Sequence, residues 1–311
     1  MEYEVVSHQH LPGIRVFVVE IFSRTAHTHR EFELCLLLRG GMQIDMAEGR
    51  AKLRPGEMAL ISPWQPHAFQ AEAEGALLLI LQASPQFCAG YFPQAAQLRF
   101  EGAVPLPAAC AARLRPQLLE LGRHCFSRPA GYEFLAMGAV NWLFGGLFAS
   151  LRWHTEPQQV DRGASRVMRV AAQIESDYAE PLRLKELAEA EGVSADYLSH
   201  AFRRYLGMTF QAYLSQVRLE HAAGLANRTQ MSVTDICAAC GYSSPRYLTA
   251  DFRRKYGCTL AQWRARPERG PTQAQPPAPD TRQRFYYHEE ALEALARFEM
   301  QSSPKIPHTG A

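Results

Sequence analysis

The sequence carries little net charge, an odd number of cysteines and almost no long apolar run. Its 311 residues include 33 Lys and Arg against 31 Asp and Glu, which excludes a uniformly acidic or basic chain. The seven cysteines are scattered, and their odd number argues against a disulfide framework. The opening MEYEVVSHQH is polar and charged, unlike a signal peptide. We therefore expect a cytoplasmic protein that is long enough for two domains.

One uncharged stretch, 134–151 (FLAMGAVNWLFGGLFASL), approaches the length of a membrane-spanning helix. It contains Asn141 and several small residues, and Arg152 follows it directly. A helix that is buried in the protein or packed in a dimer explains these features better, so we expect no membrane contact.

Signals for catalysis are also missing. No acid–base pair, nucleophile or phosphate-binding loop independently supports an enzymatic reaction. Cys237 and Cys240 form a CxxC motif, but no second pair lies near them to complete a metal site. Both are expected to pack inside a short helix. The chain is therefore predicted to be a non-enzyme without a cofactor.

What the sequence does contain is one stretch used twice. Residues 194–209 (SADYLSHAFRRYLGMT) and 244–259 (SPRYLTADFRRKYGCT) agree at eight positions when they are offset by 50. A repeat of this kind usually means one supersecondary unit present twice. In each copy a serine suited to cap a helix comes first, an apolar stripe follows, and a glycine ends the pattern.

Each copy is preceded by a shorter helical pattern that also ends at glycine, LKELAEAEG at 184–192 and VTDICAACG at 233–241. A short helix, a glycine turn and a basic amphipathic helix are typical of a helix-turn-helix. We predict two such motifs, at 184–206 and 233–256, joined by a helix over 209–226. This helix spans about 27 Å, which would hold the two recognition helices about one DNA turn apart on one face.

The charge distribution also favours a nucleic-acid interface. Residues 162–269 hold 16 Lys and Arg against 11 Asp and Glu, whereas residues 1–161 hold 13 against 15 and residues 270–311 hold 4 against 5. A positive excess confined to the repeat region is the footprint expected for DNA, although a solvated basic face gives the same count.

The side chains expected to face DNA occupy matching positions on the two recognition helices. They are Asp196, Ser199, His200, Arg203 and Arg204 on the first, and Arg246, Thr249, Ala250, Arg253 and Arg254 on the second. Arg246 is the best candidate for a guanine contact, because arginine can donate twice to one base. At least two of the four repeated arginines are expected only to contact phosphate or water.

The N-terminal part has a different pattern. Short apolar runs separated by glycine turns extend from Ile14 to about Leu81 (IRVFVVEIF, FELCLLL, GMQIDMA, EMALISP and ALLLILQ). This spacing predicts a β-sandwich or small barrel. Apolar periodicity then predicts two helices within residues 106–152, placed to complete the barrel core or to form a dimer seam.

A polar pattern lies within this barrel, at His27, His29, Glu33 and His67. It resembles the cupin family, in whose metal-binding members the matching positions hold one divalent ion, and this ligand set suits Fe, Mn, Zn or Ni. In sensory cupins joined to DNA-binding domains, a similar pattern commonly occurs without a required metal. We therefore predict no metal and keep these four residues as the candidates for one. With Trp64 they are expected to line a pocket for a small polar effector.

The predicted fold class is two-domain α+β, with an N-terminal cupin-like or jelly-roll-like β-barrel, two accessory helices and a C-terminal all-α domain. The predicted boundaries are an effector-binding and dimerisation domain at 1–152, a linker at 153–164, a helical domain at 165–267, a disordered linker at 268–284 and a tail at 285–311 with a possible short helix.

Two segments of the helical domain, PLRLKELAEAEGVSADYLSHAFRRYLGMTFQAYLSQVRLEHA and MSVTDICAACGYSSPRYLTADFRRKYGCTLAQWR, resemble the DNA-binding domain of AraC/XylS-type transcription regulators. With the cupin-like front half, this resemblance implies a homodimeric regulator, more often an activator, that binds double-stranded DNA, a small-molecule effector and RNA polymerase. The effector is expected to be a sugar or a related metabolite. One departure is Arg183, where the family often has a Ser or Thr cap. The alternative is a metal-dependent cupin enzyme that carries a DNA-binding appendage.

Overall fold

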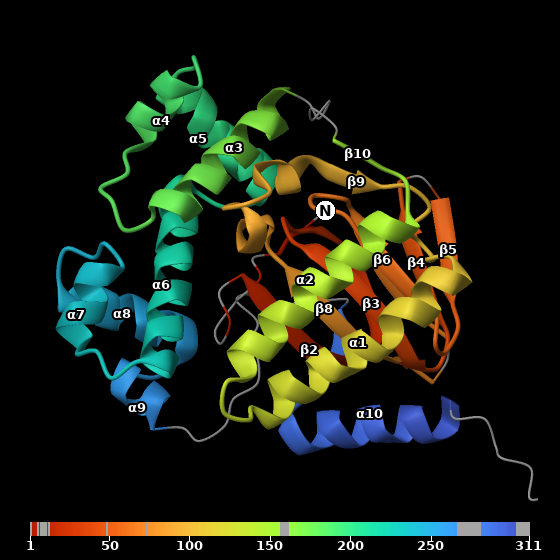
Figure 1. Cartoon of the computed structure of the whole chain (residues 1–311). Helices are drawn as coiled ribbons and strands as arrows, with labels where there is room; N and C mark the ends of the chain where they lie inside the picture. The colour runs from red at the N-terminus through yellow and green to blue at the C-terminus, as the bar shows by residue number, and fades with distance from the viewer. Residues whose placement is uncertain are drawn as a thin grey trace, which may run out of the picture.

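The computed structural model describes residues 2–4, 6, 11, 13–47, 49–72, 74–155, 162–265 and 281–302. It consists of a β-barrel flanked by helices and a second group of helices beside it (Figure 1). The predicted two-domain α+β fold is confirmed, with two accessory helices on the barrel and two helix-turn-helix motifs in the helical domain.

One long strand organises the barrel. β2 (Ile14–Thr28) pairs first with β8 and then with β7, within the strand path β5-β4-β7-β2-β8-β3-β6. The remaining strands here are β1 (Glu2–Tyr3), β3 (Phe32–Arg39), β4 (Met42–Met46), β5 (Gly49–Leu53), β6 (Met58–Ile61), β7 (His67–Ala71) and β8 (Ala76–Ala83).

Both faces of β3 and β8 are buried, which explains their continuous apolar runs. Successive side chains along a strand point to opposite faces. Leu36 and Leu79 therefore belong to the core beneath the helices, whereas Leu37 and Leu78 belong to the core inside the barrel.

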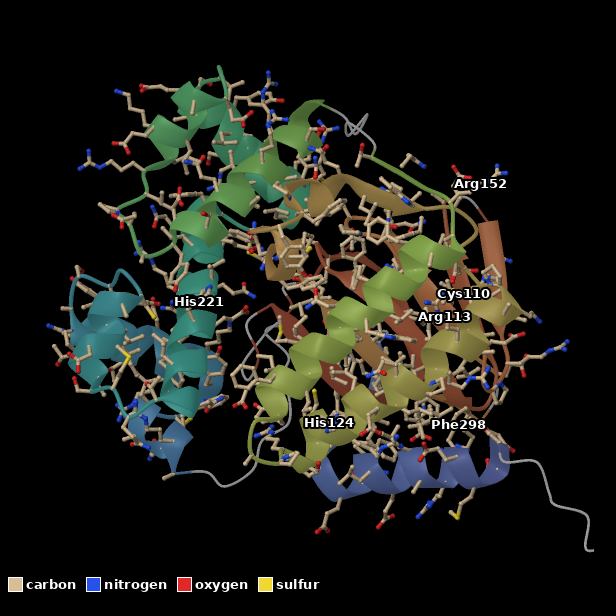
Figure 2. All side chains as sticks on the ribbon, in the orientation of Figure 1. Cys110, Arg113, His124, Arg152, His221 and Phe298 are labelled. Carbon is tan, nitrogen blue, oxygen red and sulfur yellow. The ribbon has the colours of Figure 1, made fainter. Side chains whose placement is uncertain are left out.

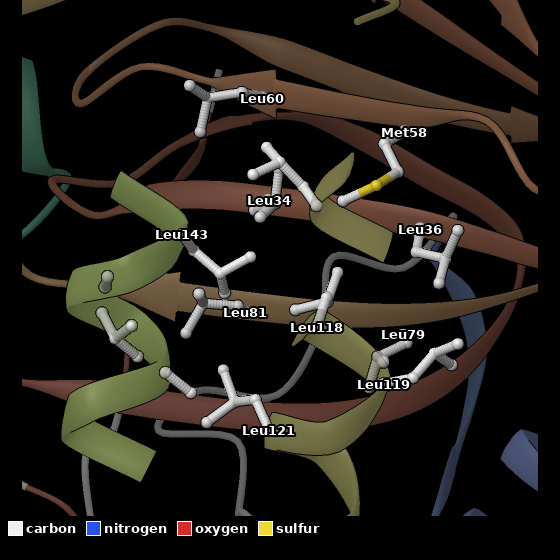
Figure 3. Close-up of a cluster of buried hydrophobic side chains, with 14 of the residues drawn as sticks. Leu34, Leu36, Met58, Leu60, Leu79, Leu81, Leu118, Leu119, Leu121 and Leu143 are labelled. Carbon is white, nitrogen blue, oxygen red and sulfur yellow. The ribbon is translucent and has the colours of Figure 1, made fainter. Parts of the chain in front are cut away.

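Two helices cover the outer face of this sheet, α1 (Ala108–Ser127) and α2 (Tyr132–Ser150). Leu118 and Leu143 from these helices meet Leu34 and Leu81 from the strands (Figure 3). Among the helices of the described segments, none is both long and apolar enough to cross a membrane. Two short 3-10 turns, η1 (Pro85–Cys88) and η2 (Pro93–Gln97), lead into β9 (Leu98–Phe100), which pairs with β10 (Trp153–Thr155).

The helical domain has two small cores that share one helix. Its elements are α3 (Arg162–Asp177), α4 (Leu184–Ala190), α5 (Ala195–Leu206), α6 (Phe210–Arg228), α7 (Val233–Ala239), α8 (Pro245–Tyr256) and α9 (Leu260–Arg264). The first half of α6 packs with α3 to α5 through Tyr213 and Val217. Its second half packs with α7 to α9 through Leu219 and Ala223.

The helix ends are set largely as the sequence predicts, with one exception. Gly207 and Gly257 end α5 and α8 in the left-handed region, at φ 69° and 68°, which favours glycine. The Ser194 hydroxyl accepts from the Tyr197 amide. Ser244 stands at the matching position but forms no side-chain cap, because the Tyr247 amide bonds the Ser244 carbonyl instead.

Both predicted linkers are corrected by the structure. In the first, predicted at 153–164, residues 153–155 form β10 and α3 begins at Arg162. In the second, predicted as disordered over 268–284, Arg282–Tyr286 form β11, which pairs with β2. A strand edge offers main-chain partners even to a polar segment, so no apolar run is needed. The tail contains α10 (His288–Ser302), and residues 156–161 and 268–280 lie outside the described residues.

Candidate nucleic-acid interface and buried histidine site

The DNA-facing positions predicted on α5 and α8 have matching exposure in the structure. Eight of the ten side chains are exposed, and Ser199 and Thr249 are half-buried at equivalent places. The residues between them, such as Leu198, Phe202 and their counterparts Leu248 and Phe252, are fully buried. Each helix therefore inserts an apolar side into its own core and presents a polar side to solvent.

The predicted arginines differ in their local partners. Arg203 donates to the Ser199 hydroxyl at 3.2 Å, one turn earlier on α5. Arg254 forms an ion pair with Asp251 at 2.6 Å. The side chain of Arg246, at the start of α8, has no ion pair or hydrogen bond with any described residue. It is therefore available to donate both guanidinium edges to a ligand.

Two aromatic residues on these helices were missed by the sequence prediction. Tyr247 is 62% exposed and Tyr197 is 43% exposed. The signal was present, since the two tyrosines coincide in the repeat. An identity between the two copies can therefore mark a surface residue as well as a core residue.

α6 fixes the separation of the two recognition helices. Its 19 residues correspond to about 28 Å of rise. Because α6 contributes buried residues to both cores, the helix serves as a rigid spacer between the motifs (Figure 1).

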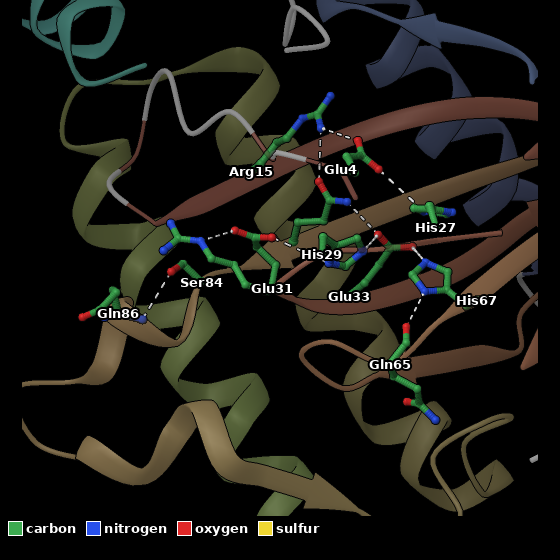
Figure 4. A network of polar contacts seen from close by, with 12 residues as sticks. Glu4, Arg15, His27, His29, Glu31, Glu33, Gln65, His67, Ser84 and Gln86 are labelled. Carbon is green, nitrogen blue, oxygen red and sulfur yellow. Dashed lines mark hydrogen bonds and ion pairs between the residues drawn. The ribbon is translucent and has the colours of Figure 1, made fainter. Parts of the chain in front are cut away.

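Four of the five residues predicted to line the effector pocket come together at one end of the barrel (Figure 4). The ring centroids of His27 and His67 lie 4.2 Å apart, and those of His29 and His67 lie 5.2 Å apart. Glu33 joins them, with one carboxylate oxygen 3.0 Å from His29 Nε2 and the other 3.8 Å from His67 Nε2. All four side chains are buried.

Hydrogen bonds fix the orientation of two imidazoles. His27 Nδ1 lies 3.0 Å from the Thr25 carbonyl, and His67 Nδ1 lies 2.9 Å from the Gln65 carbonyl. A carbonyl only accepts, so each Nδ1 carries the proton and each Nε2 keeps a lone pair. Burial holds the pKa of His27 well below its usual value and lowers the pKa of His67 to about 4.

This donor set fits a divalent transition metal. One ligand atom from each of His27, His29 and His67 lies within 4.8 Å of the other two. Burial opposes the charge on Glu33, but the hydrogen bond from His29 and its charge hold the pKa of Glu33 well below the usual range. The neutral imidazoles of His27 and His67 beside a carboxylate are suitable ligands for Zn, Fe, Mn or Ni. Burial opposes the charge on His29, but Glu33 raises the pKa of His29, so His29 would have to release a proton to join them.

A buried polar network extends from the histidines into β2 and β8. Gln82 donates to Glu33 at 2.7 Å and accepts from Arg15 at 3.2 Å. Glu4 lies 3.7 Å from the Arg15 guanidinium and 3.6 Å from His27 Nε2. Sequence reasoning missed Arg15 and Gln82, because they lie within apolar runs and only strand pairing brings them to Glu33.

Trp64 lies apart from the other four residues. Its backbone is left-handed, at φ 64°, and its amide donates to the His29 carbonyl at 2.7 Å. The side chain packs against the buried core formed by α3 to α6. Trp64 therefore connects the backbone of the histidine site to the helical domain.

A partly buried ion pair also joins the histidine site to the helical domain. Arg30, next to His29, pairs with Glu175 on α3. Glu175 also accepts from the Tyr213 hydroxyl at 2.6 Å. The Tyr213 ring meets Phe202 of α5 in an edge-to-face contact, with centroids 6.0 Å apart. A continuous set of contacts thus runs from the segment that carries His29 and Arg30 to the first recognition helix, α5.

Comparison with known proteins gives two family matches on different parts of the chain. Residues 20–125 match the model of the AraC-like ligand-binding domain, and residues 187–266 match a helix-turn-helix domain model. The HTH-type transcriptional activator RhaR of Klebsiella pneumoniae is 26% identical over 257 residues, covering 77% of this chain and 87% of that protein. RhaR of Salmonella schwarzengrund is 24% identical over 251 residues, covering 76% and 86%.

Comparison with solved structures also gives matches to all or part of the chain. The C-terminal domain of AraT, a response regulator from Geobacillus stearothermophilus, is 30% identical, with a TM-score of 0.31 over 32% of this chain and 84% of that one. A point variant of ToxT from Vibrio cholerae, solved in its apo form, is 10% identical, with a TM-score of 0.42 over 83% and 99%.

Proposed function

The chain belongs to the AraC family of transcription regulators, and from this membership we propose that it binds a specific double-stranded DNA site and activates transcription there. The observation that carries the proposal is the pair of exposed, equivalent helix faces, on α5 and α8, that share one rigid helix. Recognition helices about one helical turn apart enter successive major grooves. RNA polymerase is the proposed partner at the promoter, and the cytoplasm is the proposed location.

The test is to select bound sequences from a random duplex library and to footprint the best one with hydroxyl radicals. Each protomer should protect two segments on one face of the DNA, centred about 10 base pairs apart. A footprint limited to one groove segment per protomer would argue against the proposal.

The proposed effector is a small polar molecule, a sugar or related metabolite, bound at His27, His29, Glu33 and His67. Imidazole and carboxylate groups suit hydroxyl-rich ligands, since together they donate and accept hydrogen bonds. Binding would act on DNA recognition through Trp64 and the Arg30–Glu175 pair, provided that the ligand favours one arrangement of these contacts between the barrel and the helical domain.

A thermal-shift screen of the full chain against sugars and related metabolites tests this assignment, because a ligand that binds only the folded state raises Tm. A shift that disappears in His67→Gln and persists in His124→Gln would support the site. His124 lies on α1 with its Nε2 3.2 Å from Glu120, away from the histidine site. A shift that is unchanged in His67→Gln would place the ligand elsewhere.

We also propose that the protein is a homodimer that packs through the outer face of α2. Phe134 is 86% exposed and Trp142 is 45% exposed on a helix whose only charged residue is Glu133. Gly138 and Gly145 lie on the same exposed face with open space in front of them. Small residues there allow the backbones of two helices to approach closely.

Sedimentation velocity of Trp142→Glu against Met300→Glu tests the dimer. Met300 is also exposed, at 71%, but lies on α10. Only Trp142→Glu should shift the protein toward monomer. Equal behaviour of the two variants would exclude α2 as the interface.

A second candidate for what the barrel binds is a divalent metal, favoured by the three imidazole ligand atoms within 4.8 Å. Such an ion would hold the segments that carry His27, His29 and His67 in place. It would also supply a Lewis-acid contact for a polar effector. Elemental analysis of protein purified without chelator is the test. One equivalent of metal in the parent chain and none in His27→Ala would establish it, whereas metal-free parent protein with full DNA binding would dismiss it.

A further inference from the structure

After the helical domain the chain returns to the barrel and adds a strand to it. Residues 18–21 of β2 pair with β8 and also with residues 283–286 of β11. A strand has one neighbour on each edge, so β11 occupies the edge of β2 opposite β8. It covers a row of main-chain groups that would otherwise lie open.

The helix that follows is also part of the barrel domain. Ala291, Leu295 and Phe298 of α10 are buried in the core shared by α1, α2 and the sheet, and Figure 2 shows Phe298 at this seam. Gly122 of α1 permits the contact, because a Cβ there would lie 3.0 Å from Leu295 Cδ1. Arg123 of α1 also donates to Glu299 of α10 at 2.6 Å.

β11 reaches the polar network of the histidine site. The Phe285 ring lies 5.5 Å from the Phe17 ring, and the Arg15 guanidinium stands 4.4 Å from Phe17 and 5.7 Å from Phe285. Arg15 in turn bonds Gln82, which bonds Glu33. A residue that follows the DNA-binding domain in sequence therefore covers one end of the network that holds Glu33.

We infer that residues 281–302, which we call the C-terminal clasp, belong to the sensory domain. The clasp anchors the C-terminal end of the DNA-binding domain to the barrel. The first connection joins Thr155 to Arg162 and the second joins Ala265 to Thr281. At about 3.5 Å per residue, the second connection cannot exceed roughly 56 Å. The DNA-binding domain thus moves as a segment fixed at both ends, and its recognition helices reach fewer orientations than on one linker.

The clasp also gives the effector site a second route to the DNA-binding domain, through Phe285 and Arg15. This part of the inference rests on the proposed effector function. The anchoring itself does not, since it follows from strand pairing and core packing alone.

Site-specific cleavage of the full chain tests the anchoring. A recognition site for a sequence-specific protease is placed within 156–161 in one variant, within 268–278 in a second and at both places in a third. After the first cut alone, the helical fragment should co-elute with the barrel in gel filtration at low micromolar concentration, because the clasp still holds it. Adding Leu295→Asp, which places a charge in the clasp core, should release the fragment after the same cut.

Fluorescent labels on Lys52 and Thr234, both exposed, report how the domains are placed. The distribution of label distances should widen after the cut within 268–278, while residues 281–302 remain bound to the barrel. After both cuts the helical fragment should separate.

Loss of the helical fragment after the first cut alone would overturn the inference. Retention after both cuts with unchanged label distances would also overturn it, because contacts such as Arg30–Glu175 would then place the domain without the clasp. Neither readout depends on DNA or effector binding, so failure of the proposed function would be recognised separately.

Discussion

Replacing Arg246 by alanine is the most direct test of sequence reading by α8. The side chain of Arg246 is exposed and has no hydrogen bond or ion pair with any described residue. Its removal should therefore change the free energy of unfolding by no more than about 0.5 kcal/mol. Any larger loss in DNA affinity must come from the protein–DNA contact.

The size of that loss follows from the kind of contact. A bidentate arginine–guanine pair is worth about 1–3 kcal/mol of discrimination, which corresponds to roughly 5- to 150-fold in Kd. The assay is fluorescence anisotropy with the selected site and with variants that carry each base substitution. Arg246→Ala should bind the selected site more weakly and should lose its preference at one base pair.

Arg253→Ala is the matched control, since Arg253 is also exposed on α8 and has an identical counterpart in the repeat, Arg203. A phosphate contact carries no sequence information. This variant should lose affinity on every DNA sequence, and its salt dependence should fall by about one unit of slope. If Arg246→Ala behaves in the same way, α8 does not read a base through this residue.

Three further outcomes follow from other parts of the chain. Leu295→Ala should lower the free energy of unfolding in urea by about 2–5 kcal/mol because the side chain is fully buried, whereas Met300→Ala should change it by less than about 0.5 kcal/mol; equal small effects would mean that α10 is not docked. Ser194→Ala should cost about 0.5–2 kcal/mol through loss of its cap, and Ser244→Ala should cost clearly less because its hydroxyl makes no cap; thermal unfolding distinguishes them. Burial lowers the pKa of His67 from 6.5 to about 4, so the unfolded chain takes the proton first and stability should fall as pH drops from about 6.5 to about 4. That loss should be shallower in His67→Asn, and an unchanged slope would show that His67 does not carry it.

The helical domain could be predicted almost completely because its signals are local. A cap, an apolar stripe and a terminal glycine each act within a few residues, and the repeat places all of them twice. The barrel strands were predicted where the sequence offers an apolar run, as in β2, β3 and β8. The short and mostly exposed β5 (GRAKL) offers no apolar run, and only its pairing with β4 makes it a strand.

The tail shows the limit of local signals most clearly. The apolar positions of α10 suggest one packed face, but nothing in the sequence names Gly122 as its partner. β11 reads RQRFY, which is more polar than a typical strand. Its pairing with β2 is decided by an edge more than 250 residues earlier in the chain, and no window of the sequence contains both.

The histidine site also contains residues that the sequence placed correctly and one that it did not. His27, His29, Glu33 and His67 were predicted together. The first three come from one β2–β3 segment, and the pairing of β2 with β7 brings His67 to them. Trp64 was predicted beside them because an aromatic face and polar groups together suit a sugar-like ligand. Its left-handed backbone places the side chain against the helical domain instead of among the histidines, and no residue preference for tryptophan predicts that conformation.

Under the proposed function, the two halves of the repeat distinguish candidate base-reading residues from residues that hold the fold. Among the positions that are identical in both copies, Phe202 and Phe252 pack in the two cores, and the paired arginines are suited to phosphate. On the exposed side Tyr197 and Tyr247 are also identical, but other positions differ, with Asp196 against Arg246 and His200 against Ala250. Both copies must pack the same kind of core, so their core residues stay alike. Two different DNA half-sites, in contrast, require different exposed side chains. Under the proposed function the two helices would therefore present different chemistry to successive grooves, and the DNA site should be a pair of dissimilar segments rather than a direct repeat.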